Sequence, residues 1–178
     1  MTDKELLRYC VEVVREVDVP EPYDVNSMCD LLEQSRQREI SLVQIVMPTG
    51  PGVPCGLWVA TDDVDYILYP KHTSKAHQAH IASHEIAHIL LGHESSPAHQ
   101  EEVSQLLMPN LNPALVRTVL GRTIYTSQEE RAAEMVASLL PMQAGRPVSR
   151  PQDADMRPGV ANLVSHLERS LERSAGRI

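Results

Sequence analysis

Two histidines and a glutamate lie close enough in this sequence to bind a metal ion and activate water. They belong to the segment His84-Glu85-Ile86-Ala87-His88, which fits the pattern HExxH. Residues four apart share one face of an α-helix, so both imidazoles could reach one Zn²⁺ ion. Glu85 lies about 100° around the helix from His84. This angle places its carboxylate beside the ion, where it could take a proton from a bound water.

A zinc site of this kind needs a third protein ligand. Gly92 and His93 have the wrong offsets for the pattern HExxHxxGxxH, in which a third histidine completes the site. Gluzincins instead take a glutamate from a later helix, and Glu130 could reach the ion as that third ligand. Glu134 lies four residues further on the same face, where it could accept the free N–H of a ligand histidine and fix its tautomer.

Helix capping offers a simpler role for the same glutamates. Thr126 with Glu129 and Ser127 with Glu130 both have the spacing of a capping box. We favour Thr126 with Glu129, which leaves Glu130 free to bind the metal. Glu134 could also be an ordinary exposed helix residue.

Three further residues could contribute to the site or only to the fold. His80 and His84 form a rival histidine pair at a spacing of four, which we consider the weaker alternative. His93 either lines the site or is a cation at the end of a helix. Tyr125 could stabilise an oxyanion, although a packed aromatic side chain at the start of a helix is the more common role.

Apolar spacing and breaker residues predict the elements that position these side chains. The HExxH helix is expected over about 74–91, with Gly92 after its end, and the glutamate helix from 126 or 127 to 140, before Pro141. The runs 56–60 and 66–69 indicate an antiparallel hairpin with a five-residue connection. Further elements are expected as helices over 2–18, about 26–38 with Ser27 as its cap, 100–107, 113–121 and 159–174, and a strand over 40–48.

Composition limits the classes of function. The chain has 178 residues and a net charge of −8, so extended binding to nucleic acid would meet phosphate repulsion. The three cysteines fit neither a disulfide framework nor a CxxC metal site, which favours a reducing compartment. With no apparent signal peptide or membrane span, we expect a cytoplasmic protein that binds neither membrane nor nucleic acid directly.

Two motifs together resemble the ImmA/IrrE family of metallopeptidases. The first runs from His84 to His93 and follows a hairpin. The second runs from Glu130 to Pro141, Glu-Arg-Ala-Ala-Glu-Met-Val-Ala-Ser-Leu-Leu-Pro. The similarity covers about residues 25–141. Glu134 stands where the family usually has Asp or Asn.

The resemblance implies an α+β fold, a mostly helical zincin-like domain with a small antiparallel sheet packed on the HExxH helix. We expect this domain over 1–141, a linker over 142–158 and a C-terminal amphipathic helical segment over 159–178. The family implies one Zn²⁺ per chain and regulated proteolysis of a helix-turn-helix repressor or antitoxin, hence a role in transcription regulation. The alternatives are a zinc-bearing regulator that binds such a repressor without cleaving it, and a metal-free scaffold whose histidines are ordinary core residues.

Overall fold

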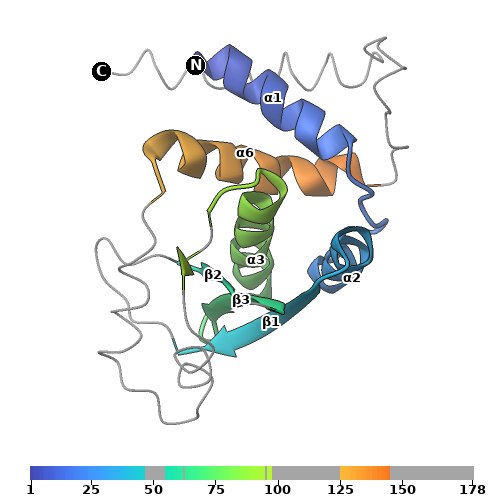
Figure 1. Cartoon of the computed structure of the whole chain (residues 1–178), viewed down its shortest axis with the longest axis vertical. Helices are drawn as coiled ribbons and strands as arrows, with labels where there is room; N and C mark the ends of the chain where they lie inside the picture. Colours follow the sequence, from blue (N-terminus) through green and yellow to red (C-terminus); the bar gives the residue numbers. More distant parts are fainter. Residues whose placement is uncertain (47–54, 62, 95, 98–124, 145–178) are drawn as a thin grey trace.

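The helices and the sheet of this chain lie in successive layers (Figure 1). The computed structural model describes residues 1–46, 55–61, 63–94, 96–97 and 125–144. Within this part, helix α1 (Asp3–Arg15) crosses helix α6 (Ser127–Gln143), and α6 packs on helix α3 (Lys75–Leu90). In turn, α3 packs on the sheet, with helix α2 (Val25–Arg36) beside α3 and the first strand. The HExxH helix therefore lies between a sheet and the helix that carries the candidate third ligand.

The first two helices begin at side-chain caps. Helix α1 (Asp3–Arg15) begins with a capping box, in which Thr2 and Glu5 each accept the other's backbone N–H. Helix α2 (Val25–Arg36) is capped by Asp24, whose carboxylate accepts the N–H of Ser27. The prediction of Ser27 as the cap was therefore wrong. Asp24 is the better candidate in physical terms, because a carboxylate at this position also interacts favourably with the helix dipole.

The sheet is mixed, not antiparallel as expected. Strands β1 (Glu39–Ile45), β2 (Leu57–Ala60), β3 (Val64–Pro70) and β4 (Ser96–Pro97) have the spatial order β1-β3-β2-β4. The predicted hairpin is present as the antiparallel pair β2 and β3, but its connection is shorter because β3 already begins at Val64. β1 runs parallel to β3 and β4 runs parallel to β2. Hairpin signals are local, whereas the direction of β1 depends on a long-range pairing that the sequence pattern does not encode.

The two site helices have nearly the predicted bounds. Helix α3 (Lys75–Leu90) is capped by Ser74, and Gly92 follows with a φ of 67°. Helix α6 (Ser127–Gln143) is capped by Thr126 and continues through Pro141. The prediction that Pro141 stops this helix was wrong. It lies in the last turn, directly after the buried side chains of Leu139 and Leu140, and their packing offsets the lost backbone hydrogen bond.

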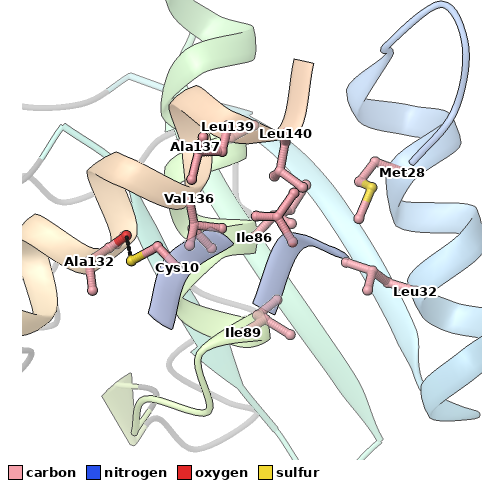
Figure 2. Packing of buried hydrophobic residues seen from close by; sticks show 14 of the residues in the cluster. Cys10, Met28, Leu32, Ile86, Ile89, Ala132, Val136, Ala137, Leu139 and Leu140 are labelled. Atoms are coloured by element: carbon pink, nitrogen blue, oxygen red, sulfur yellow. Dashed lines mark hydrogen bonds between the residues drawn. The ribbon is translucent and has the colours of Figure 1, made fainter. Parts of the chain in front are cut away.

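The core forms where all these elements meet. Ile86 of α3 lies beside Val136 and Leu140 of α6, and residues of α1 and α2 belong to the same cluster (Figure 2). Ala133 and Ala137 of α6 are almost fully buried, and their small side chains let α6 approach α3 closely. The Cys10 thiol of α1 donates to the carbonyl of Ala132 at 3.7 Å. This packing holds α3 and α6 side by side.

A buried carboxylate ties the sheet to α2. Asp65 of β3 is fully buried and contacts the guanidinium groups of Arg36 at 2.6 Å and Arg38 at 3.0 Å. Its second oxygen accepts the indole N–H of Trp58 at 3.1 Å. Two cations and one neutral donor thus compensate the burial of this charge.

Several predictions fall on residues that the structure does not describe. They are the short helices at 100–107 and 113–121, residues 145–158 of the predicted linker, and the C-terminal helix. None of the helices in the described part of the chain has the length and apolar character needed to cross a membrane.

Candidate metal centre

Helix α3 directs two imidazoles to one point. His84 and His88 are one turn apart, and their Nε2 atoms lie 3.1 Å from each other. The His84 side chain is 20% exposed, whereas that of His88 is 1% exposed. Burial, together with the neighbouring His84 and His93, lowers the pKa of His88 to about 3. Near neutral pH this imidazole is therefore uncharged, which is the form that binds a metal.

Helix α6 brings a carboxylate to the same point. Thr126 and Glu129 form the capping box, so the preference for this pair over Ser127 and Glu130 is confirmed. Glu130 is left with an oxygen 3.3 Å from Nε2 of His84 and another 3.9 Å from Nε2 of His88. A helix cap thus decides which of two adjacent glutamates faces the histidines.

The three side chains form a group that could hold a metal ion. One ligand atom from each of His84, His88 and Glu130 lies within 4.8 Å of the others. Ligands about 2.0–2.1 Å from a tetrahedral ion would lie about 3.3 Å apart, close to the separations found here. Two imidazoles and a carboxylate are also a common donor set for zinc and neighbouring transition metals. The residues therefore fit such an ion.

Glu134 lies behind His84, on the side away from this group. One of its oxygens is 3.4 Å from Nδ1 of His84, and the other is 3.1 Å from Nε2 of His80. His80 is not part of the three-residue group found among the described residues. Glu134 thus contacts the ring nitrogen of His84 that faces away from His88 and Glu130, and His80 contacts Glu134.

Glu85 is buried between α3 and strand β2. Only 5% of the Glu85 residue is exposed to solvent. Burial, and secondarily the charge of Glu130, raises the pKa of Glu85 to about 8, while a hydrogen bond from the backbone N–H of Trp58 opposes this shift. A Cβ atom at Gly56 would lie 2.6 Å from a Glu85 oxygen. Gly56 therefore leaves the space that this carboxylate occupies.

Tyr125 and His93 both pack against His88. The Tyr125 ring stacks on His88 with a centroid distance of 3.7 Å, and Nδ1 of His93 lies 2.8 Å from Nδ1 of His88. The Tyr125 hydroxyl is buried and has no hydrogen-bond partner among the described residues. Burial and then the charges of Glu85 and Glu130 raise its pKa. A buried hydroxyl on a ring stacked against His88 could donate to a ligand in the centre.

Gly56 and Trp58 also contribute to the site, although the sequence pattern does not indicate it. Gly56 begins the apolar run 56–60 that predicts a strand, and this pattern does not indicate that it faces Glu85. The contribution of Trp58 is a backbone N–H, which carries no sequence signal. Its contact with Glu85 arises only when β2 packs against α3. No local pattern could have identified either residue.

The comparisons with known proteins do not add a relative. No family model, no curated protein and no solved structure matches this chain. The case for a function therefore rests on the geometry of the site and on the motifs of the sequence.

Proposed function

We propose that this chain is a zinc-dependent endopeptidase that acts in regulated proteolysis. The observation that carries the proposal is the convergence of His84, His88 and Glu130, with Glu85 buried next to them. A structural zinc site is usually closed by four protein ligands. Among the described residues, three such ligands lie beside a buried carboxyl group and a tyrosine hydroxyl that has no partner there. Three protein ligands are the donor count of a hydrolytic site with an open position.

The proposed chemistry divides the work between the ion and the protein. A zinc ion held by the three ligands would lower the pKa of a water and polarise the scissile carbonyl. Glu85 accepts a proton from the attacking water and passes it to the leaving amine. Tyr125 donates its hydroxyl proton in a hydrogen bond to the carbonyl oxygen as that oxygen gains charge. Glu134 holds the Nδ1–H of His84, which directs Nε2 to the ion.

Glu85 must be ionised to act as the base. In the metal-free protein its raised pKa favours the protonated form at neutral pH. A divalent cation next to the carboxyl group would stabilise the charged form. Metal binding and the activation of Glu85 are therefore coupled in this proposal.

The substrate would be an extended segment of a protein. β3 lies between β1 and β2, so the hairpin offers an edge only along β2. β4 pairs with Val59 and Ala60, and no described strand pairs with the first half of β2 on that side. A peptide could add there by backbone hydrogen bonding, next to Glu85. From the similarity to the ImmA/IrrE motifs, we propose a helix-turn-helix repressor or antitoxin as the partner.

Metal content is the first test of this proposal. Mass spectrometry of purified wild type, Glu130→Ala and Glu134→Ala should find about one zinc per wild-type chain. Glu130→Ala should lose the zinc because a ligand is removed, whereas Glu134→Ala should keep it when zinc is in excess and bind it about 10-fold to 100-fold more weakly. Wild type that takes up no zinc after loading would exclude the hydrolase and favour the metal-free scaffold.

Cleavage is the second test. A peptide library incubated with zinc-loaded wild type should acquire new N-termini that are absent with Glu85→Gln, which leaves the ligands intact. If wild type holds zinc, binds a co-purified regulator and cleaves neither it nor the library, the alternative of a non-cleaving zinc regulator is favoured.

A further inference from the structure

The C-terminus of α3 has the hydrogen bonds of a Schellman motif. Leu91 is the C-cap residue and Gly92 follows in the left-handed region, with a φ of 67°. The N–H of Gly92 donates to the carbonyl of Ile89 at 3.2 Å, and the N–H of His93 donates to the carbonyl of His88 at 3.1 Å. These are the two bonds that define the motif. The chain thus turns back on the last turn of α3.

This turn brings the side chain of His93 onto His88. In Schellman motifs the second residue after the cap commonly contacts the residue that accepts its N–H, usually through apolar side chains. Here both residues are histidines. Their Nδ1 atoms lie 2.8 Å apart and their ring centroids 4.9 Å apart. The position that is usually an apolar contact at a helix end is therefore occupied by a hydrogen bond between His93 and His88, a candidate metal ligand.

The distance requires one proton between the two rings. If His88 donates from Nδ1, its Nε2 is free to bind a metal. If His93 donates instead, a neutral His88 carries its proton on Nε2, which blocks the lone pair that faces His84 and Glu130. Because His88 is fully buried, water cannot easily replace its partner at Nδ1. The role of His93 as an acceptor therefore matters for the tautomer of His88.

We propose that His93 is a positioning residue, which accepts the Nδ1–H of His88 and so holds Nε2 ready for the metal. The proposal rests on the zinc site proposed above. Outer partners of metal-bound histidines are commonly carboxylates, backbone carbonyls or water. Here the partner would be a second imidazole, and it is placed by a glycine four residues after the ligand.

Zinc affinity tests this role directly. The full-length chain and its variants are titrated with zinc in competition with a chromophoric chelator. His93→Ala should bind zinc about 10-fold to 100-fold more weakly than wild type. His93→Asn should lose less affinity, because its amide oxygen can still accept a hydrogen bond. His77→Ala is the matched control, an exposed histidine at the start of the same helix, and should bind zinc like wild type.

Two further measurements separate positioning from a general structural effect. Zinc affinity is also measured for Gly92→Ala and for the double variant Gly92→Ala/His93→Ala. Both substitutions remove the same contact between His93 and His88, so the double variant should bind zinc no more weakly than the weaker-binding of the two single variants. Long-range ¹⁵N–¹H spectra of the zinc-loaded protein should show a protected proton on Nδ1 of His88. This proton should exchange faster in His93→Ala.

The outcomes distinguish the two proposals. If wild type binds zinc and His93→Ala binds it within twofold of wild type, the role of His93 is wrong while the zinc site stands. A Nδ1 proton of His88 that exchanges equally fast in zinc-loaded wild type and His93→Ala would contradict it as well. If wild type binds no zinc at all, both proposals fail together.

Discussion

At the scale of single residues, neighbouring groups of the same type have different environments and hence different chemistry. Glu130 is half exposed and faces two imidazoles, whereas Glu85 is buried beside a strand. Burial disfavours the ionised form of a carboxyl group, so the pKa of Glu85 is raised to about 8. His88 is shifted in the opposite direction, to about 3, for the same reason. Both shifts favour uncharged side chains in the metal-free centre.

The raised pKa of Glu85 predicts a pH-dependent stability in the metal-free protein. The folded value is about 8 and the reference value is 4.5. The contribution of protonated Glu85 to the free energy of unfolding is therefore fully present below about pH 4.5. It is lost as the pH rises through 8, because the unfolded chain ionises this carboxyl group more readily than the folded chain does. Glu85→Gln cannot ionise, so relative to wild type it should gain up to about 4 kcal/mol in the free energy of unfolding between pH 4.5 and 8.5.

Urea unfolding of both chelator-treated proteins at several pH values measures this difference. Comparing the two proteins at each pH cancels the contributions of the other titrating groups. A difference that does not change with pH would show that Glu85 is not buried as described.

At the scale of elements, the site depends on how α3, α6 and β2 approach one another. The Thr126 cap sets where α6 begins and which glutamate faces α3. The absence of a side chain at Gly56 lets β2 pass close to Glu85. Asp65 of β3 accepts the indole N–H of Trp58 and so holds this side chain of β2 in place. Each of these contacts involves a residue that packs against a glutamate of the candidate site or against its neighbour on β2.

Gly56→Ala should disturb Glu85 while leaving the metal ligands in place. The new Cβ would lie 2.6 Å from a Glu85 oxygen and 2.6 Å from Cγ2 of Ile81, so one of them must move. Overpacking of this kind costs about 1–3 kcal/mol of stability. In ¹⁵N–¹H spectra the Trp58 amide signal should shift toward that of Glu85→Gln, because the bond to the carboxylate is lengthened. Zinc affinity should stay near the wild-type value, and its loss would mean that the whole site is distorted.

Asp65→Ala should destabilise the contact between α2 and the sheet. The substitution leaves two guanidinium groups and one indole N–H without their shared acceptor. Because Arg36 and Arg38 are partly exposed and can rehydrate, we expect about 3 kcal/mol, the low end for a broken buried ion pair. Urea unfolding measures this, with Asp63→Ala as the control, because Asp63 is exposed in the same hairpin. Equal effects of the two substitutions would contradict the role of Asp65.

At the scale of the whole molecule, the proposed zinc ion would join two layers. His84 and His88 belong to α3, whereas Glu130 belongs to α6, which also carries α1 through its packing and the ion pair between Arg131 and Asp3. A ligand that binds only the folded state stabilises it by mass action. Free zinc at 1,000 times its Kd should add about 4 kcal/mol to the free energy of unfolding.

Thermal unfolding at several zinc concentrations measures this stabilisation. The Tm of wild type should rise steadily with free zinc, and Glu130→Ala should show a much smaller rise. A metal-free Glu130→Ala protein should unfold near the metal-free wild type, because Glu130 is half exposed. An equal rise in both proteins would place the bound zinc elsewhere.

The sequence by itself determined the features that depend on residues a few positions apart. The HExxH spacing, the caps of α1 and α6 and the glycine after α3 follow from local geometry, so they could be predicted. The Schellman contact of His93 could also have been predicted, since Gly92 lies four residues after His88. The choice of Glu130 over Glu129 followed from the cap and needed no tertiary information.

Only the tertiary structure decided the features that join distant segments. These are the parallel pairing of β1 with β3, the continuation of α6 through Pro141, the amide of Trp58 on Glu85 and the network around Asp65. Each depends on burial or on hydrogen bonds between elements far apart in the chain. The energies of these interactions exceed local conformational preferences, and the interactions leave no periodic pattern in the sequence. The candidate ligands could thus be predicted from the sequence, whereas the burial and hydrogen bonds that shift the pKa values of His88 and Glu85 could not.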